Sequence, residues 1–219
     1  MKIGILGTGI VGQTIGSALT QLGHEVKIGS RTKTNEKALA FVEKHKENNA
    51  SNGTFEDAAD FGDIVFNCTK GENSLEAIAL TGNSLKEKIL IDVTNPLDFS
   101  KGMPPSLIPA LSNTNSVGEE IQRLYPQTKV VKTLNTMWCS LMVNPRLIED
   151  GNRVNYLCGN NAEAKSIVKD LLKQFGWADQ NLLDLGDITN ARATEATLPI
   201  WLRVYGARKS GVFNFQIVG

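Results

Sequence analysis

Lys2-Ile3-Gly4-Ile5-Leu6 is followed at once by Gly7-Thr8-Gly9-Ile10-Val11-Gly12, and this stretch decides the fold. The first part is typical of a short buried strand, and the second has the G-x-G-x-x-G spacing of a dinucleotide-binding turn that opens a helix. Gly7 allows a sharp turn, Gly9 a close approach of the backbone to a pyrophosphate, and Gly12 tight packing of the helix on the strand. The helix start favours anions, so we predict cofactor phosphates there, against Gly7, Thr8, Gly9, Ile10, Val11 and Gly12. The alternative is a glycine-rich surface turn, which the setting within one βαβ unit of about 30 residues disfavours.

The end of the second expected strand, residues 25–29, indicates which dinucleotide binds. An NAD site places Asp or Glu there, about 20 residues after the glycines, to bind the ribose 2′-hydroxyl. This chain instead has Ser30, Arg31, Thr32 and Lys33, with no carboxylate to repel a 2′-phosphate. Arg31 can hold that phosphate with two charged hydrogen bonds, and the hydroxyls and Lys33 can add to it. We therefore predict NADP(H); the alternative is a solvated polar turn.

Composition excludes several classes of function. The 219 residues carry 23 basic and 23 acidic side chains, so nothing points to nucleic acid or a membrane surface as a partner. Three widely spaced cysteines without a C-x-x-C pair predict reduced thiols in a cytoplasmic protein, with neither a disulfide framework nor a metal site. The expected strand at residue 2 argues against a signal peptide. No apolar run approaches the roughly 18 residues of a membrane-spanning helix.

Strands and helices alternate along most of the chain, which predicts an α/β fold with a doubly wound, Rossmann-type parallel sheet. We expect strands over 2–6, 25–29, 63–67, 88–92 and 129–133, a polar turn over 48–53, and helices over 35–46, from Thr54, over 74–80 and over 116–124. The pattern changes near Asn144-Pro145. We therefore divide the chain into an NADP-binding domain, residues 1–143, and a small C-terminal α/β part, residues 144–219, that closes the substrate cleft. That part is expected to hold strands over 152–158 and 182–185, helices over 162–175 and 190–208 with a kink or break at Pro199, and a strand in the tail, 211–218.

Ligands of such a fold bind beyond the carboxyl ends of the strands. Small polar groups follow the later strands at this edge and could contact ribose and nicotinamide. We assign to the cofactor Cys68, Thr69, Lys70, Asn95, Pro96 and Asn135. Each of these segments taken singly could instead be an ordinary turn.

A ketone or imine reductase needs a proton donor beside the hydride acceptor, and we identify none, so no catalytic residue is assigned. The two histidines are unsuitable, because His24 precedes the second strand at the wrong edge and His45 is expected on a solvated helix surface. Lys70 could equally bind phosphate, and Cys68 has no base nearby, which favours an inert buried thiol. Hydride transfer between two bound cofactors needs aligned rings more than a protein acid.

The chain resembles the coenzyme F420-dependent NADP oxidoreductases, which pass hydride between NADPH and an 8-hydroxy-5-deazaflavin. The resemblance covers nearly the whole chain and rests on residues 7–12, 22–25, 29–31, 56–59 and 129–132, on Asn190-Ala191-Arg192, and on Glu195 and Pro199. It implies a homodimer that acts on a small-molecule redox substrate, bound near Asn135, Thr136, Met137 and Trp138.

One segment departs from the family. Residues 134–138 read Leu-Asn-Thr-Met-Trp where archaeal deazaflavin enzymes have a His and smaller apolar residues. A flavin, a ferric complex or a small imine or keto substrate therefore stays open as the acceptor, and so does a non-catalytic NADP-binding redox sensor. The membrane-bound metalloreductases resemble this domain too.

Overall fold

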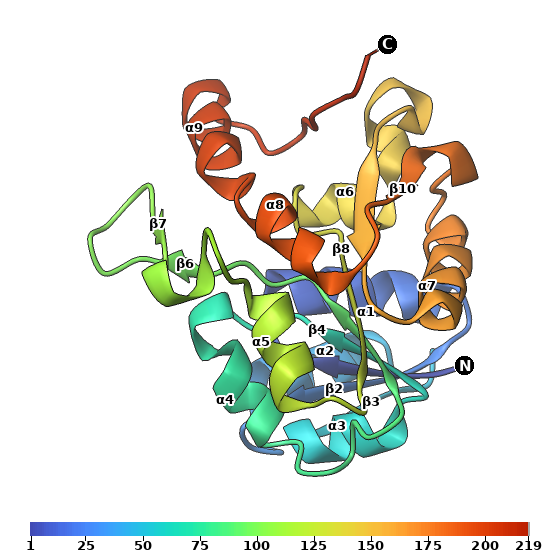
Figure 1. Ribbon diagram of the computed structural model, residues 1–219. Helices are drawn as coiled ribbons and strands as arrows, with labels where there is room; N and C mark the ends of the chain where they lie inside the picture. The colour runs from blue at the N-terminus through green and yellow to red at the C-terminus, as the bar shows by residue number, and fades with distance from the viewer. Residues whose placement is uncertain (219) are drawn as a thin grey trace.

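One eight-stranded sheet forms the centre of the structure (Figure 1). The computed structural model describes residues 1–218. The sheet has the order β10-β9-β8-β5-β4-β1-β2-β3. Its strands are β1 (Lys2–Leu6), β2 (Glu25–Ser30), β3 (Ala50–Thr54), β4 (Ile64–Asn67), β5 (Ile89–Asp92), β8 (Lys129–Thr133), β9 (Asn155–Cys158) and β10 (Leu182–Asp184). All neighbours from β3 to β8 are parallel, so the doubly wound, Rossmann-type α/β fold is confirmed.

The order of the strands also marks the place where a ligand is expected. From β1 the chain builds outward to β2 and β3 on one side, and from β4 to β5 and β8 on the other. The carboxyl ends of β1 and β4 therefore flank the topological switch point, which is where open α/β sheets bind ligands.

Two strands from the C-terminal part extend this sheet. β9 runs antiparallel to β8, with Lys132 opposite Cys158 and Thr133 opposite Leu157, and β10 runs parallel to β9. Residues after 143 thus add to the existing sheet, and their separate role in closing a substrate cleft stays a prediction.

Helices cover both faces of the sheet. They are α1 (Ile10–Gln21), α2 (Glu36–Lys44), α3 (Phe55–Phe61), α4 (Ser74–Ala79), α5 (Val117–Leu124), α6 (Cys139–Val143), α7 (Ala162–Gln174), α8 (Ala191–Glu195) and α9 (Leu198–Arg208). One buried cluster packs α1, α2, α6 and α7 against one face, and another packs α3, α4, α5 and α8 against the other. In Figure 1, α3, α4 and α5 lie together on one side and α7 on the opposite side.

Smaller elements surround the carboxyl edge of the sheet. A hairpin of β6 (Leu97–Asp98) and β7 (Ser106–Leu107) follows β5 and was not predicted. Its Leu97 packs on a third buried cluster, formed by α9 and the tail. Figure 1 shows α9 next to this hairpin, at the end of the molecule away from the N-terminus. Short 3-10 turns are Gly71–Asn73, Pro109–Leu111, Pro145–Leu147, Glu149–Gly151, Asp179–Asn181 and Ile188–Asn190.

Several expected elements were placed wrongly. The predicted polar turn over 48–53 holds most of β3, whose sequence Ala-Ser-Asn-Gly-Thr has no large apolar side chain but pairs in register with β2. The predicted tail strand over 211–218 is absent, since these residues join no strand of the sheet. The last helix is interrupted between Glu195 and Leu198, which confirms the expected break; Pro199 lies in the first turn of α9, where its missing N–H costs little.

Candidate cofactor and redox site

The turn after β1 has the shape that a dinucleotide requires. Gly7 has a φ of +114°, and a Cβ on it would lie 2.7 Å from the carbonyl oxygen of Cys68. A Cβ on Gly12 would lie 2.2 Å from the carbonyl oxygen of Gly7. At Gly9, by contrast, a Cβ would meet no described atom within 4 Å. Packing within the protein therefore explains Gly7 and Gly12, whereas the open side of Gly9 is space that a bound group can use.

The start of α1 is available to an anion. Side chains cap α2, α3, α5 and α7, with the oxygen of Asn35, Thr54, Ser116 and Asn161 accepting from a first-turn N–H. Gly9 is the N-cap residue of α1, and within residues 1–218 no side chain caps this helix and no acidic residue occupies its first turn. Its first N–H groups thus face outward beside the open side of Gly9, as a pyrophosphate site needs.

One cavity of about 530 Å³ brings most of the predicted cofactor residues together. Its predicted lining residues are Gly7, Thr8, Gly9, Ser30, Arg31, Thr32, Cys68, Thr69 and Lys70. The sequence analysis missed the other lining residues, which are Asn35, Lys37, Phe55, Asn73 and Ala77. Of these, Lys37 could have been found, because capping of α2 by Asn35 places it in the first turn after residues 30–33. Ile10, Val11, Gly12, Lys33, Asn95, Pro96 and Asn135 lie outside this lining.

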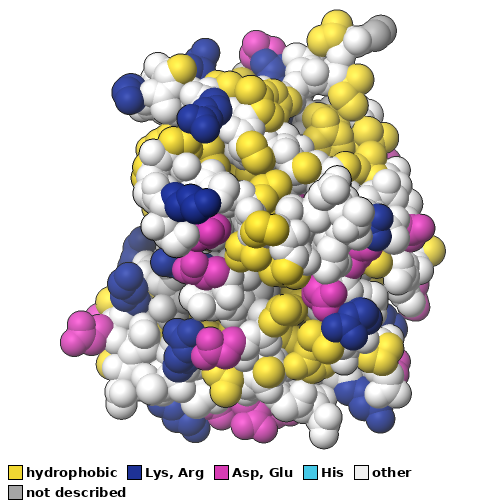
Figure 2. All heavy atoms as spheres, turned by 60° about the vertical axis from the view of Figure 1, so that its left-hand side comes forward, with side chains coloured by type: hydrophobic (Ala, Val, Ile, Leu, Met, Phe, Trp, Pro, Cys, Tyr) yellow, Lys and Arg dark blue, Asp and Glu magenta, His cyan; other side chains and the backbone are white. Residues whose placement is uncertain are grey.

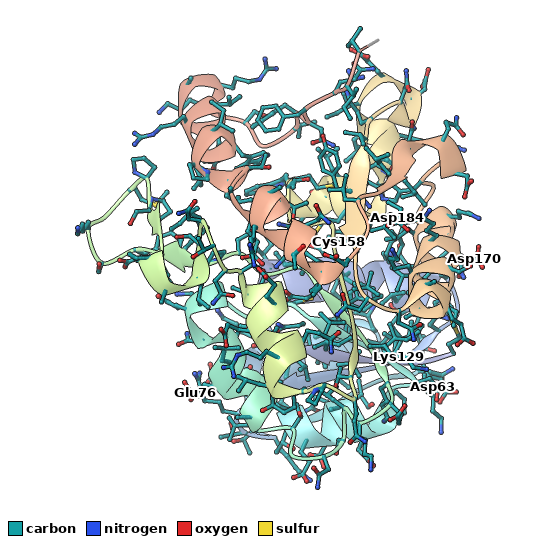
Figure 3. All side chains as sticks on the ribbon, viewed as in Figure 1. Asp63, Glu76, Lys129, Cys158, Asp170 and Asp184 are labelled. Carbon is teal, nitrogen blue, oxygen red and sulfur yellow. The ribbon has the colours of Figure 1, made fainter. Side chains whose placement is uncertain are left out.

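The segment proposed for the 2′-phosphate holds two exposed cations. The Nε of Arg31 lies 3.4 Å from Oε1 of Glu76, and the Nζ of Lys33 lies 3.1 Å from Oδ2 of Asp57. Glu76 belongs to α4, and in Figure 3 it lies at the lower left, on the opposite side of the molecule from Asp184. Ser30 is buried, and its hydroxyl donates to the carbonyl of Thr32, which shapes the turn. Both cations stay accessible to a ligand despite their partners.

The segment after β4 offers a cation and no nucleophile. Burial, together with the charge of Asp92, raises the pKa of the Cys68 thiol far above its usual range, so this thiol stays neutral. The Nζ of Lys70 lies 3.6 Å from Glu72 and 5.9 Å from the ring centre of Phe99, and its side chain is largely exposed. Lys70 can therefore serve binding, whereas Cys68 is an inert buried side chain.

The ends of β5 and β8 are joined by two asparagines. Asn95 Nδ2 donates to the carbonyl of Asn135 at 2.8 Å, and Asn135 Nδ2 donates to Asn95 Oδ1 at 2.9 Å. In the described part of the chain nothing donates to Asn135 Oδ1, although it is buried. This acceptor is one that an amide donor can satisfy.

The predicted substrate residues differ in accessibility. Thr136 and Met137 are only 2% and 6% exposed. Trp138 is half-buried and stacks with Trp201 and Tyr205 of α9, at ring-centre distances of 6.2 and 5.7 Å. Trp138 is therefore the member of this segment whose side chain a second substrate could reach.

Both histidines are engaged away from this edge. His24 Nε2 lies 2.9 Å from Gln174 Oε1, as expected for a residue at the opposite edge. The prediction that His45 is solvated was wrong: it ends α2, is 5% exposed, and pairs with Ser17 and Thr20 of α1. Among residues 1–218 no group of three or more His, Cys, Asp or Glu side chains could hold a metal ion. Nor does the described chain contain a helix long and apolar enough to cross a membrane.

A buried ionic network below the carboxyl edge was missed. Lys132 of β8, Asp92 of β5 and Glu195 of α8 are each at most 2% exposed and form two ion pairs. The available signal was Lys132 itself, a lysine inside a strand whose neighbours are predicted to be buried on both faces.

The comparisons with known proteins point to one family. Residues 2–96 match the family described as NADP oxidoreductase, coenzyme F420-dependent. The F420-dependent NADP reductase of Methanocaldococcus jannaschii is 31% identical over 228 residues, which cover 97% of both chains. The chain belongs to the coenzyme F420-dependent NADP oxidoreductase family. Membership in the F420-dependent family makes it an NADP-dependent oxidoreductase and confirms the resemblance found in its sequence.

Two further relatives place the family in context. A crystal structure from Arthrobacter sp. FB24, for which an F420-dependent NADP reductase function has been proposed, is 45% identical, with a TM-score of 0.92 over 100% of both chains. Rat metalloreductase STEAP3 is 31% identical over 207 residues. These cover 91% of this chain but 38% of STEAP3, so the chain spans well under half the length of that metalloreductase.

Proposed function

We propose that this protein transfers a hydride between NADPH and a deazaflavin, coenzyme F420. The observation that carries this proposal is a cavity lined both by Gly9, at the uncapped start of α1, and by Arg31. The segment after β2 that contributes Arg31 has no acidic residue. That combination suits a dinucleotide with a 2′-phosphate. Family membership supports the second substrate.

Residues of the chain then take defined roles. The N–H groups of residues 10–12, the open side of Gly9 and the Thr8 segment hold the pyrophosphate. Ser30, Thr32 and Lys33 support Arg31 around the 2′-phosphate. Thr69, Lys70 and the Asn95–Pro96 turn face the nicotinamide half.

The nicotinamide end needs orientation. Bound NADPH supplies the hydride, and the F420 ring system takes up one hydride and one proton. Asn135 Oδ1 is a free acceptor that can receive the N–H of a carboxamide, and the part of the Trp138 ring left exposed offers aromatic surface to a second ring system. The histidines are engaged elsewhere, so we infer that the proton comes from solvent and that the chain contributes ring alignment.

A steady-state assay tests the proposal. NADPH oxidation by the purified protein is followed with F420, with FMN and without acceptor, and binding of NADPH and NADH is measured by calorimetry. We expect turnover with F420 and tighter binding of NADPH than of NADH. Tight NADPH binding without turnover on either acceptor would contradict the enzymatic proposal and favour a redox sensor.

A second acceptor class has support of its own. STEAP3 is as similar in identity as the archaeal reductase, and residues 134–138 are the segment in which this chain departs from the archaeal deazaflavin enzymes that it resembles. Reduction of a ferric complex through a flavin is therefore the second candidate. Turnover with FMN plus ferric citrate, but not with F420, would select it.

We also propose a cytoplasmic homodimer. Ile200, Val212 and Ile217 are 46–61% exposed, and an apolar cavity of about 360 Å³ lies beside Ile200 and Phe215. Figure 2 shows hydrophobic side chains grouped toward the top right of the face it presents. All three cysteines are unpaired and buried, as suits a reducing compartment. Light scattering after gel filtration tests the assembly; a monomer at micromolar concentration would contradict it.

A further inference from the structure

The network of Lys132, Asp92 and Glu195 joins five segments of the chain. The Nζ of Lys132 lies 2.8 Å from Asp92 Oδ2 and 2.6 Å from Glu195 Oε1, and it also donates to the carbonyl of Thr94. The three N–H bonds of the ammonium group thus have three acceptors. Burial by itself would lower the pKa of Lys132, but the two carboxylates outweigh it and raise the pKa, so the ammonium stays charged.

Asp92 connects this network to the loops assigned to the cofactor. Its Oδ1 accepts from Asn67 Nδ2 at 2.9 Å and from the hydroxyl of Thr94 at 2.8 Å. Asn67 Oδ1 in turn accepts from the hydroxyl of Thr69 at 2.8 Å. Asp92 therefore fixes the first residues beyond β4 and β5, which lead directly into the Cys68–Lys70 and Asn95–Pro96 segments.

Glu195 connects the network to helices α5, α8 and α9. Glu195 is the last residue of α8, and its carboxylate accepts from the backbone N–H of Val117 at 3.0 Å and of Gly118 at 3.2 Å, at the start of α5. Three residues later α9 begins, which carries Trp201 and Tyr205 onto Trp138. Glu195 thus holds the base of the segment that supports the aromatic cluster.

Among residues 1–218, Lys132 forms ion pairs with Asp92 and Glu195 alone. Cys158, labelled in Figure 3, lies opposite Lys132 in the β8–β9 pair. Burial raises the pKa of its thiol to about 12, so this neighbour is neutral. Burying an ammonium group between two carboxylates costs free energy unless all of its hydrogen bonds are made. The positions of Asp92 and Glu195 therefore both depend on the position of the Lys132 Nζ.

We propose that Lys132 and Glu195 are positioning residues that couple the cofactor-side loops to helices α8 and α9, so that the aromatic side of the site is aligned when NADPH binds. This inference rests on the proposed NADPH site. Within residues 1–218 no hydrogen bond or ion pair of Glu195 reaches a residue that lines the dinucleotide cavity, so its effect is predicted to pass through Lys132 and Asp92.

Hydrogen exchange measured by mass spectrometry tests the coupling without any turnover. In the wild-type protein, NADPH is expected to slow amide exchange in residues 191–208. In Glu195→Gln the first-turn N–H groups of α5 lose a carboxylate, and we expect most of that protection to disappear while the dissociation constant for NADPH changes less than about threefold. Arg192→Gln is the matched control, because it breaks another ion pair between the same two helices, that of Arg192 with Glu119, which lies nearer the surface than the Lys132 network; it should keep the protection.

The outcomes separate this inference from the proposed function. Bound NADPH without protection of residues 191–208 in the wild type, or equal protection in Glu195→Gln, overturns the coupling and leaves the enzymatic proposal standing. Protection without turnover on any acceptor overturns the enzymatic proposal only. With an active acceptor, Glu195→Gln should lower kcat about tenfold with the KM for NADPH unchanged. If the Gln variant does not fold, Glu195→Asp replaces it, because its shorter side chain draws the carboxylate away from Lys132 and the start of α5, and it should lose the protection in the same way.

Discussion

The Nε of Arg31 lies 3.4 Å from Oε1 of Glu76, so the cation proposed to hold the 2′-phosphate already faces a carboxylate on α4. The two side chains are 57% and 60% exposed, and an ion pair this exposed contributes little to folding. The pair keeps the guanidinium at the rim of the cavity and also sets a negative charge close to where the phosphate would bind. Removing the Arg31 cation should therefore weaken NADPH binding, whereas removing the Glu76 carboxylate should strengthen it.

Replacing Arg31 by Ala should weaken NADPH binding by about 1.5–3 kcal/mol, the range of a charged hydrogen bond, and hardly change NADH binding. Calorimetry with both cofactors measures the difference. Lys129→Ala is the control, since Lys129 starts β8 at the opposite edge of the sheet and lies far from Glu76 in Figure 3. An equal loss for NADPH and NADH would contradict the 2′-phosphate role.

Replacing Glu76 by Gln should tighten NADPH binding by up to about 1 kcal/mol, the scale of an exposed ion pair, because a competing charge is removed. NADH affinity should stay the same, since NADH has no 2′-phosphate. The effect should shrink in high salt, which screens exposed charges. Weaker NADPH binding in this variant would show that Glu76 orients Arg31 instead of competing for it.

A substitution at Gly9 tests whether the pyrophosphate binds in the open space beside this residue. A Cβ here meets no described atom, so Gly9→Ala should shift the free energy of unfolding by no more than about 0.5 kcal/mol. NADPH affinity should nevertheless fall about tenfold, or about 1.4 kcal/mol, because the methyl group occupies the space of the pyrophosphate. Gly206→Ala in α9, where a Cβ also meets nothing, is the matched control. Unchanged affinity in Gly9→Ala would place the phosphates elsewhere.

His45 should make stability depend on pH. The hydroxyl of Thr20 donates to the carbonyl of Ser17, so the network assigns Nδ1 of His45 as the donor to Thr20 and Nε2 as the acceptor from Ser17. Burial, aided by the charge of Lys44, lowers the pKa of His45. The unfolded chain therefore binds a proton more readily, and stability should fall as the pH drops below about 6.5. Denaturant unfolding between about pH 5 and 8 should show a shallower fall for His45→Gln; equal slopes would contradict a neutral buried ring.

The contribution of Asp57 to the free energy of unfolding should depend on pH. Its carboxylate accepts from the backbone and hydroxyl of Thr54 in the capping box of α3, and these bonds, with Lys33, lower the pKa of Asp57 to about 2. Its contribution is complete above the unfolded pKa of about 4 and is lost as the pH falls through about 2. Asp57→Ala should cost about 1 kcal/mol at neutral pH, measured by urea unfolding. The difference from the wild type should shrink towards pH 2 and vanish below it, and a constant difference would argue against the cap.

Most of the sheet was predictable because local and global signals agree there. β1 and β8 have the predicted bounds, and each has an apolar centre and leads into a turn with small polar residues. The glycine spacing of residues 7–12 predicted both the turn and the exposed helix start. β3 could not be found this way, because its stability comes from pairing with β2 and not from its own side chains.

The parts of the site that depend on tertiary packing escaped prediction. His45 follows an amphipathic helix, and nothing local shows that α1 supplies two hydroxyls to it. Asp92, Lys132 and Glu195 are separated widely in the chain, and their contact depends on α8 folding back over α5. Thr136 and Met137 follow a strand at the correct edge, but the turn after β8 directs them inward.

The reversal of β9 decides where this scaffold can accept change. Because β9 runs against β8, its first residues, not its last, lie at the edge where NADPH is proposed to bind, and Asn155 Oδ1 there accepts from the backbone of Leu134. The tail reaches the same place, since Asn214 Nδ2 donates to the carbonyl of Val154. The turn after Cys158 points to the opposite edge. Added sequence or a fused domain at residues 159–161 would therefore extend away from the proposed NADPH site. An insertion of the same length before Asn155 would extend towards that site.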